Sequence, residues 1–199
     1  GTHQVLTEYE KNQKIKWIRC VDEGIYDAMN KAVAEAQGEY VCFVNSDDYL
    51  EKDALKIFVN NIKTSENADL LVHGSHIVKA GRRVKRPIVS RLPIWLKMPF
   101  DHQATLVRKT FFINSGGYFL KYGLIADYEF FLRNVRKASI KVHRQYTNNL
   151  VRGGRSNFSK SSRHLNLALK DHGFNVCIRS LALTARKAMQ ITSVWRRLL

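Results

Sequence analysis

The chain alternates short apolar runs with longer segments in which apolar residues recur every three or four positions. Apolar runs at 15–20 and 40–44 predict strands, and the recurring patterns at 3–11, 25–36 and 53–62 predict helices. Strands that alternate with helices favour an α/β fold with a mostly parallel sheet covered by helices on both faces. Ligands of such sheets bind beyond the carboxyl ends of the strands, so the loop after the second strand is a candidate site.

The pattern changes beyond residue 65. It predicts five further elements, namely strands at 69–79, 84–90 and 103–108 and helices at 111–117 and 128–137. Ala80-Gly81-Arg82-Arg83 is typical of a turn that joins the first two of these strands into a hairpin. Seven basic residues and no acids lie between Lys79 and Lys97. The hairpin therefore borders an anionic partner or forms a solvated sheet edge.

The segment 178–199 has the pattern of a basic amphipathic helix. A helical projection gathers Leu181, Ala185, Ala188, Ile191, Trp195 and Leu198 on one side, with Arg179, Arg186, Gln190 and Arg197 opposite. Such a helix lies on an anionic membrane surface or packs onto the rest of the protein. We expect two parts in the chain, a domain at 1–165 and a basic helical extension at 166–199.

The net charge of +16 is distributed unevenly. Residues 1–78 hold 8 Lys and Arg against 13 Asp and Glu, whereas residues 79–199 hold 25 against 4. The basic half is expected to meet a polyanion, which could be nucleic acid, anionic lipid headgroups or a phosphate-bearing substrate. No zinc-finger spacing, RNP-like aromatic motif or helix-turn-helix pattern favours nucleic acid, so no nucleic-acid partner is expected.

Three widely spaced cysteines, Cys20, Cys42 and Cys177, are odd in number, which favours buried thiols in a reducing compartment over disulfides or a zinc site. A length of 199 residues suffices for one substantial domain. The first residues lack a signal-peptide pattern, and no apolar run approaches the roughly 20 residues that span a bilayer. These features predict a cytoplasmic location.

Two adjacent carboxylates, Asp47 and Asp48, stand just after the apolar run 40–44 and Asn45-Ser46. Hard divalent cations such as Mg²⁺ and Mn²⁺ prefer carboxylate oxygens and often share them with substrate phosphates. The same acids could instead only open the next helix, where negative charge favours the helix dipole and Ser46 could cap. The pair taken alone supports both interpretations equally.

Four segments stand in a fixed order along the chain: Asp22-Glu23-Gly24-Ile25-Tyr26-Asp27-Ala28-Met29-Asn30-Lys31, Asn45-Ser46-Asp47-Asp48, His102-Gln103-Ala104-Thr105 and Ala126-Asp127-Tyr128-Glu129. With the later Gly153-Gly154-Arg155-Ser156, they resemble the motifs of family-2 glycosyltransferases. These are nucleotide-sugar enzymes of the GT-A fold, and the resemblance is strongest to the branch that builds bacterial surface polysaccharides. It extends from residue 1 to about residue 165.

The resemblance implies roles for three acids. Asp48 would bind the Mg²⁺ or Mn²⁺ ion that bridges the donor diphosphate, and Asp47 would contact the ribose or share the metal. Asp127 matches the catalytic base, which takes the proton of the acceptor hydroxyl during attack on the anomeric carbon. From the residues alone, Asp127 could also be only a dipole partner of its helix, and Glu129 could be the base instead.

The resemblance also implies donor contacts from the first segment, through Asp22, Gly24, Asp27, Asn30 and Lys31. A solvated helix face explains Lys31 equally well. His102 falls near the reaction centre, where it would contact phosphate, metal or acceptor, or would make a structural hydrogen bond.

The glycine turn at 153–154 has arginines on both sides. Arg152, Arg155 and Ser156 could close over the donor diphosphate, because arginine forks suit phosphate oxygens. This is a hypothesis about donor binding.

The chain departs from the family at its start. Family members begin with a strand, a helix and a second strand, and Gly1-Thr2 matches the Gly-Thr just after that second strand. The resemblance therefore implies that this unit is missing, which would leave a sheet edge unpaired and the nucleotide pocket incomplete.

The expected function is inverting, metal-dependent transfer of a sugar from a nucleotide sugar to a saccharide or polyprenyl-linked acceptor. The family branch implies exopolysaccharide, O-antigen or capsule biosynthesis, with segment 178–199 at the inner face of the cell membrane. The alternatives are a catalytically inactive fragment and a basic nucleic-acid-binding module, whose binding would depend strongly on salt.

Overall fold

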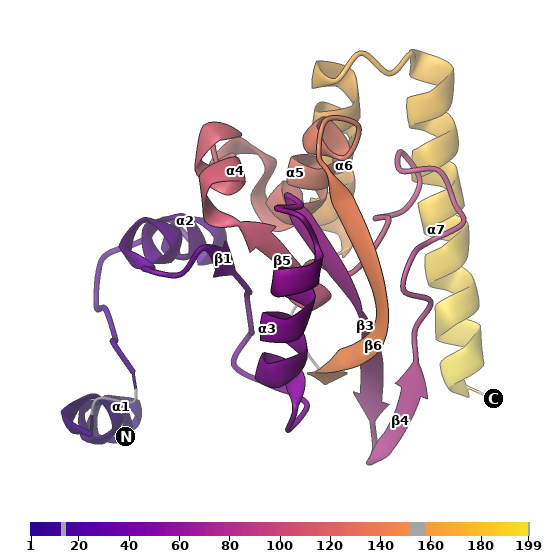
Figure 1. The fold of residues 1–199 in the computed structure, drawn as a ribbon. Coiled ribbons are helices and arrows are strands. Elements are labelled where there is room, and N and C mark those ends of the chain that lie inside the picture. The colour runs from indigo at the N-terminus through magenta and orange to yellow at the C-terminus, as the bar shows by residue number, and fades with distance from the viewer. Residues whose placement is uncertain (13–14, 152–157, 199) are drawn as a thin grey trace.

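The computed structural model describes residues 1–12, 15–151 and 158–198, and for 158–160 and 189–198 it describes the backbone alone. A curled sheet forms the centre, with helices packed around it (Figure 1). Its strands are β1 (Tyr40–Val41), β2 (Tyr49–Leu50), β3 (Leu70–Lys79), β4 (Arg82–Lys85), β5 (Thr105–Arg108) and β6 (Ile140–Val151). They follow the order β1-β5-β3-β6-β2, and β4 pairs with β3.

Seven α-helices and two 3₁₀ helices are described. The α-helices are α1 (Thr2–Lys11), α2 (Ile25–Glu35), α3 (Ala54–Thr64), α4 (Lys109–Asn114), α5 (Ala126–Asn134), α6 (Phe158–Asp171) and α7 (Val176–Leu198). The 3₁₀ helices are η1 (His102–Ala104) and η2 (Leu120–Ile125). Helices at 25–36, 53–62, 111–117 and 128–137 were expected, and each is found with its ends shifted by a few residues.

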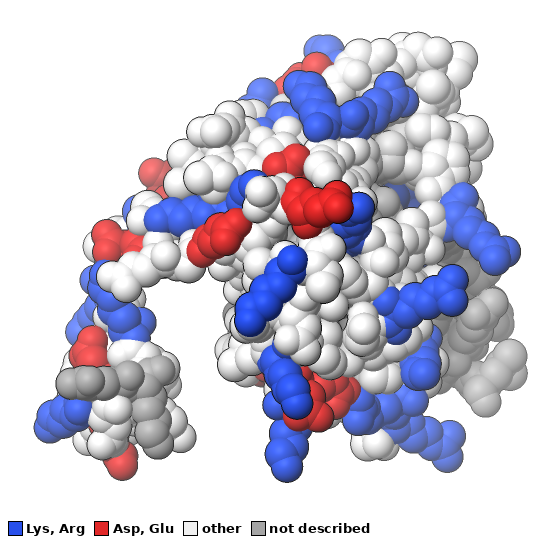
Figure 2. Space-filling view, in the orientation of Figure 1, with Lys and Arg blue, Asp and Glu red and all other residues white. Residues whose placement is uncertain are grey.

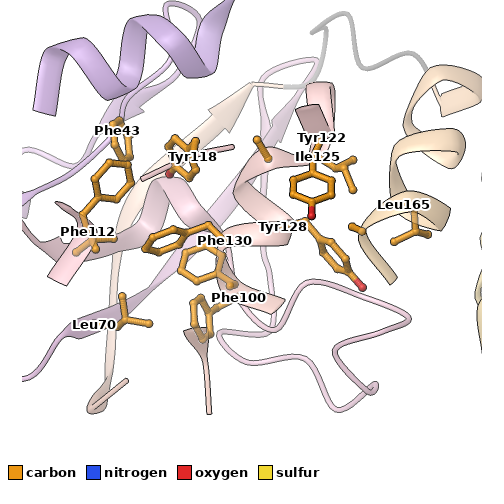
Figure 3. Packing of buried hydrophobic residues seen from close by; sticks show 14 of the residues in the cluster. Phe43, Leu70, Phe100, Phe112, Tyr118, Tyr122, Ile125, Tyr128, Phe130 and Leu165 are labelled. Carbon is orange, nitrogen blue, oxygen red and sulfur yellow. The ribbon is translucent and has the colours of Figure 1, made fainter. Parts of the chain in front are cut away.

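Helices cover both faces of the sheet because successive residues of β3 point in opposite directions. Leu70 and Val72 lie in the larger core cluster, which includes side chains of α2, α4, α5, α6 and α7. Leu71, between them, lies in a second cluster with Phe58 of α3. Figure 3 shows the aromatic part of the larger cluster, where Phe130 of α5 lies among other rings. The expected α/β class is thereby confirmed.

The strand directions are mixed, which corrects the expectation of a mostly parallel sheet. Among the described strands, only β3 and β6 pair in parallel, and the other pairs are antiparallel. The reason lies in the connections. A parallel neighbour needs a crossover, and the chain between β3 and β6 contains α4 and α5, whereas β4 follows β3 through a short turn at Ala80 and Gly81.

The hairpin of β3 and β4 is confirmed, but β4 ends at Lys85 rather than at residue 90. Residues 86–101 contain no helix or strand. Figure 2 shows Lys and Arg side chains gathered around this hairpin, as the run of basic residues predicted.

The strand expected at 15–20 is wrong. These residues contain no strand in the structure and run between α1 and α2, away from the sheet (Figure 1). A strand persists only where its backbone finds a neighbour to bond, and no described strand pairs with this segment. The apolar run instead lines a hollow of about 720 Å³ beside α2.

β6 was not expected, because its buried half is polar. Thr147, Asn148 and Asn149 are each at most 2% exposed, so the segment lacks the alternation that marks a strand. Asn148 Nδ2 donates to the carbonyl of Gln103 at 2.6 Å, and Asn149 Nδ2 donates to Glu51 Oε1 at 3.0 Å. These hydrogen bonds use the Nδ2 groups of both buried amides and fix the neighbouring loops, whereas Asn149 Oδ1 has no partner among the described residues.

The C-terminal helices share the core of the domain. The boundary expected at 165/166 falls inside α6, and Leu165 and Leu169 on either side of it are 0% exposed in the larger cluster. In α7, Ala182 is 0% exposed in the same cluster, whereas Leu181 is 57% exposed. The packed side of α7 is therefore turned away from the apolar side expected from the sequence.

None of the described helices has the length and apolar character needed to cross a membrane. The expectation that the thiols are buried is wrong for Cys20 and Cys177, which are exposed. Cys42 is half-buried, and burial raises the pKa of its thiol to about 11.

Gly74 tests the junction of β3 and β6, where the register shifts. A Cβ at Gly74 would lie 2.7 Å from the Tyr146 ring, so Gly74→Ala should force the ring or the strand to move. We expect the free energy of unfolding, measured by urea denaturation, to fall by about 1–3 kcal/mol. In a Tyr146→Ala background the same substitution should cost much less. An equal cost in both backgrounds would contradict the steric explanation.

Candidate active site

Asp127, the second residue of α5, receives hydrogen bonds from two distant parts of the chain. Tyr26 of α2 donates its hydroxyl to Oδ1 at 2.8 Å, and His102 of η1 has its Nδ1 3.1 Å from Oδ2. Because a carboxylate only accepts, the proton on this face of the His102 ring sits on Nδ1. The Asp127 side chain remains 16% exposed.

These contacts keep Asp127 ionised. Burial raises the pKa of its carboxyl, but the hydrogen bond and charge of His102, then the hydroxyl of Tyr26 and the backbone N–H of Tyr128, lower it by more. The net effect is a pKa below the usual value. Burial, and then the charge of Asp127, raise the pKa of Tyr26, so its hydroxyl stays protonated and donates.

His102 and Gln103 join the two acidic sites of the molecule. His102 holds Asp127, and the side-chain amide of the next residue, Gln103, donates to Asp48 Oδ2. The backbone N–H of Val151, at the end of β6, donates to Asp48 Oδ1 at 2.8 Å. Asp48 and Asp127 are thus held by consecutive residues of η1, although they are far apart in sequence.

The Asp47–Asp48 pair has the donors that a hard divalent ion requires. Asp47 is exposed and Asp48 is half-buried, just beyond β1. Each Asp48 oxygen accepts one hydrogen bond, which leaves lone pairs on both for a cation. No group of three or more His, Cys, Asp and Glu that could hold a metal occurs within the described residues. The pair fits Mg²⁺ or Mn²⁺ bound through one or two carboxylates and completed by substrate phosphates.

The loop before α2 is closed by its own side chains. Asp22 Oδ1 accepts from the backbone of Gly24 at 2.9 Å, and Asp27 Oδ2 accepts from Lys31 Nζ at 2.6 Å. Lys31 also donates to the carbonyl of Val21 at 2.8 Å. Gly24 caps the helix with a φ of 120°, a conformation that other residues rarely adopt. Four of the residues expected to contact the nucleotide sugar, namely Asp22, Gly24, Asp27 and Lys31, thus hold one another in place at the start of α2.

Asn30 makes a paired contact with the backbone of Tyr118. Its Nδ2 donates to the Tyr118 carbonyl at 2.8 Å, and its Oδ1 accepts from the Tyr118 N–H at 2.9 Å. Both ends of the amide are thus used within the protein, so Asn30 fastens α2 beside the segment before η2. That attachment helps place Tyr26, one helical turn earlier, against Asp127.

A cleft of about 380 Å³ opens beside Asp127 and His102. Its walls come from the loop 86–101, from η1 and from Arg186 of α7. A second groove, of about 460 Å³, lies between α2 and residues 42–46 and is lined largely by apolar side chains. The larger hollow beside α2 includes Asp22 and Lys31 but neither Asp127 nor His102, so the chemistry points to the smaller cleft.

Glu129, the alternative base, has a different position. Its side chain is 0% exposed and lies 2.9 Å from Arg133 Nε and 2.8 Å from His172 Nε2. Arg133 also donates to the carbonyls of Ser115 and Gly117. Glu129 does not line the cleft and anchors α5 to its neighbours, so of these two acids Asp127 is the one that a ligand in the cleft can reach.

Three residues that belong to the site, namely Tyr26, Gln103 and Arg186, were not identified from the sequence. Tyr26 and Gln103 stand inside the quoted motifs, but nothing in the pattern indicated that they bond to carboxylates. Arg186 stood on the expected polar side of the last helix, with no signal that it reaches a cleft. Arg152, Arg155 and Ser156 lie outside the described residues.

The chain is similar to a protein-family model and to several named glycosyltransferases. The family model for glycosyl transferase family 2 matches residues 1–128. A PGL/p-HBAD biosynthesis glycosyltransferase of Mycobacterium bovis is 34% identical over 116 residues, which cover 58% of this chain and 45% of that protein. An uncharacterized glycosyltransferase of Mycobacterium tuberculosis is 32% identical over 121 residues, which cover 59% and 46%.

A Bacillus subtilis protein named for teichuronic acid biosynthesis, the glycosyltransferase TuaG, is 41% identical over 58 residues, which cover 28% of this chain and 23% of that protein. The chain spans about half the length of the mycobacterial relatives it matches. The mixed sheet with helices on both faces is consistent with the expected GT-A-like fold. Because the match to the family model covers well over half of its residues, the chain belongs to glycosyl transferase family 2.

Proposed function

We propose that the protein is an inverting, metal-dependent glycosyltransferase that moves a sugar from a nucleotide sugar to a saccharide or polyprenyl-linked acceptor. The observation that carries this proposal is the ionised Asp127, held by Tyr26 and His102 at the edge of a cleft. The names of the relatives, in PGL/p-HBAD and teichuronic acid biosynthesis, support a role in assembling bacterial surface glycans such as exopolysaccharide, O-antigen or capsule.

Asp127 acts as the general base. Its carboxylate accepts the proton of an acceptor hydroxyl while that oxygen forms a bond to the anomeric carbon of the donor sugar. The bond from the anomeric carbon to the diphosphate oxygen breaks with its electron pair, and the nucleoside diphosphate leaves. Direct attack from the opposite face inverts the anomeric centre. Tyr26 and His102 fix the carboxylate in one orientation, which lowers the entropy cost of reaching a reactive geometry.

Asp48 is the metal-binding carboxylate in this proposal, with Asp47 as a second ligand or a ribose contact. A bound Mg²⁺ or Mn²⁺ ion would neutralise the negative charge of the donor diphosphate. Gln103 and Val151 hold Asp48 toward the edge of the sheet from which the donor would approach. The ordered helix end formed by Asp22, Gly24, Asp27 and Lys31 supports the same side of the site.

The proposed location is the cytoplasm, with segment 178–199 at the inner face of the membrane. The exposed Leu181, which lies on the expected apolar side of α7, supports contact of this helix with a lipid surface. The packing of Ala182 on the opposite side leaves that surface accessible while α7 stays attached to the domain.

Asp127→Asn should remove the base and leave the fold intact. The amide still accepts hydrogen bonds but cannot take a proton, so kcat should fall by roughly 10²–10⁴. The measurement is sugar transfer by the whole encoded protein from a panel of nucleotide sugars with Mn²⁺ or Mg²⁺. Asp171→Asn removes an equal charge from an exposed site on α6 and serves as the control. Retained transfer in Asp127→Asn would contradict the role of this residue, and a protein inactive with every donor would indicate the inactive alternative.

Asp48→Asn should weaken the dependence of donor binding on metal. We expect the Mn²⁺-stimulated part of nucleoside diphosphate binding, measured by calorimetry, to be lost, because an amide is a much poorer ligand for a hard cation. Binding without metal should change little. Unchanged Mn²⁺ stimulation in Asp48→Asn, with Asp171→Asn again as control, would remove the metal assignment.

A further inference from the structure

Arg186 brings a positive charge from the C-terminal helix into the cleft that holds Asp127. It lines this cleft together with His102 and Gln103, although it lies 59 positions after Asp127 and outside the 128 residues matched by the family model. Its guanidinium carbon lies 5.1 Å from the centre of the Tyr128 ring. The cation–π contact holds the head group at the cleft wall while its N–H groups stay available.

The position is unusual for an arginine because its charge lacks an acidic partner. No carboxylate forms an ion pair with Arg186 within the described part of the chain. Its side chain is half-buried; burial lowers the pKa of its guanidinium, while the nearby Tyr128 and Asp127 raise it. A poorly hydrated cation without a partner is stabilised when an anion binds beside it.

Most other charged groups of the cleft already have a hydrogen-bond or ion-pair partner, and Lys97 is the exception. Arg86 Nη1 pairs with Asp101 at 2.5 Å, and Asp127 accepts hydrogen bonds from Tyr26 and His102. Lys97 lines the same cleft and has no ion-pair partner among the residues that the structure describes. Arg186 and Lys97 are therefore the two cations of the cleft without an ion-pair partner among the described residues, and both share the cleft with the ionised Asp127.

We propose that Arg186, assisted by Lys97, forms an anion subsite next to Asp127 that binds a phosphate group of a substrate. That the bound phosphate belongs to a substrate rests on the function proposed above, whereas binding of an anion at this subsite does not. A guanidinium presents two parallel N–H donors to two phosphate oxygens, which fixes the orientation of the group as well as its position. The anchored phosphate would place the adjoining part of that substrate beside the base.

The phosphate has two possible sources. It belongs either to a phosphate-bearing acceptor, such as one linked to a polyprenyl carrier, or to the diphosphate of the donor. The shared chemistry is recognition of a phosphate by an arginine fork, and kinetics with the two substrates separate the sources.

The first experiment needs no turnover. Binding of inorganic phosphate to the whole encoded protein is followed by NMR titration in the native sequence, Arg186→Gln and Lys187→Gln. Lys187 is the exposed neighbour on the same helix, so its replacement removes the same charge outside the cleft. We expect Arg186→Gln to weaken phosphate binding about tenfold and Lys187→Gln to leave it within about twofold.

Arg186→Lys keeps the charge and the fold contacts of the stem but lacks the fork, so it should bind phosphate with intermediate affinity. Thermal unfolding of each variant shows whether α7 still packs. The subsite is overturned if Arg186→Gln binds phosphate as tightly as the native sequence, or if Lys187→Gln weakens binding equally.

The second experiment assigns the source. If Arg186→Gln raises KM for a phosphate-bearing acceptor and not for a phosphate-free acceptor, the acceptor supplies the phosphate. If it raises KM for the nucleotide sugar instead, the donor does, and unchanged KM values for all three overturn the assignment to a substrate. Phosphate binding that depends on Arg186 in a protein without transfer activity would retain the subsite and reject the proposed function. Transfer that depends on Asp127, with phosphate binding independent of Arg186, would retain the proposed function and reject the subsite.

Discussion

The two hydrogen bonds that converge on Asp127 connect the parts of this molecule on which its site depends. Tyr26 comes from α2, His102 from η1 and Asp127 from α5, so the bonds tie together three segments that are separate in sequence. Together with the backbone N–H of Tyr128 they lower the pKa of Asp127 by more than burial raises it. If either donor were lost, burial would meet less opposition and the pKa of Asp127 would rise.

The rest of the fold holds these donors in place. Asn30 attaches α2 to the backbone of Tyr118, and Glu129 with Arg133 anchors α5 from its buried side. The polar residues of β6 serve the neighbouring carboxylate, since Asn148 binds the backbone of Gln103 and Val151 binds Asp48. A buried hydrogen-bonded network of this kind is costly to rearrange, so the two acids keep a fixed relation.

Much of the fold was predictable from the sequence because helices and the β3–β4 hairpin depend on local patterns. The strand at 15–20 was predicted wrongly, since an apolar run becomes a strand only beside a partner. β6 was missed because its buried residues are polar. Asn148 and Asn149 are buried with hydrogen bonds to residues far away in the sequence, which a local pattern does not record. In the site, Asp127 and His102 came from ordered motifs, whereas Tyr26 and Arg186 reach the cleft only through tertiary packing.

Tyr26 and His102 lower the pKa of Asp127, so that its carboxylate is ionised beside the cleft. The most direct test is an NMR titration of the Asp127 carboxyl carbon in the native protein and in His102→Ala. We expect a native pKa below the ordinary aspartate value of about 3.9, and a higher pKa once His102 is removed, because burial then acts with less opposition. A native pKa at or above the ordinary value, or no change on removal of His102, would contradict it.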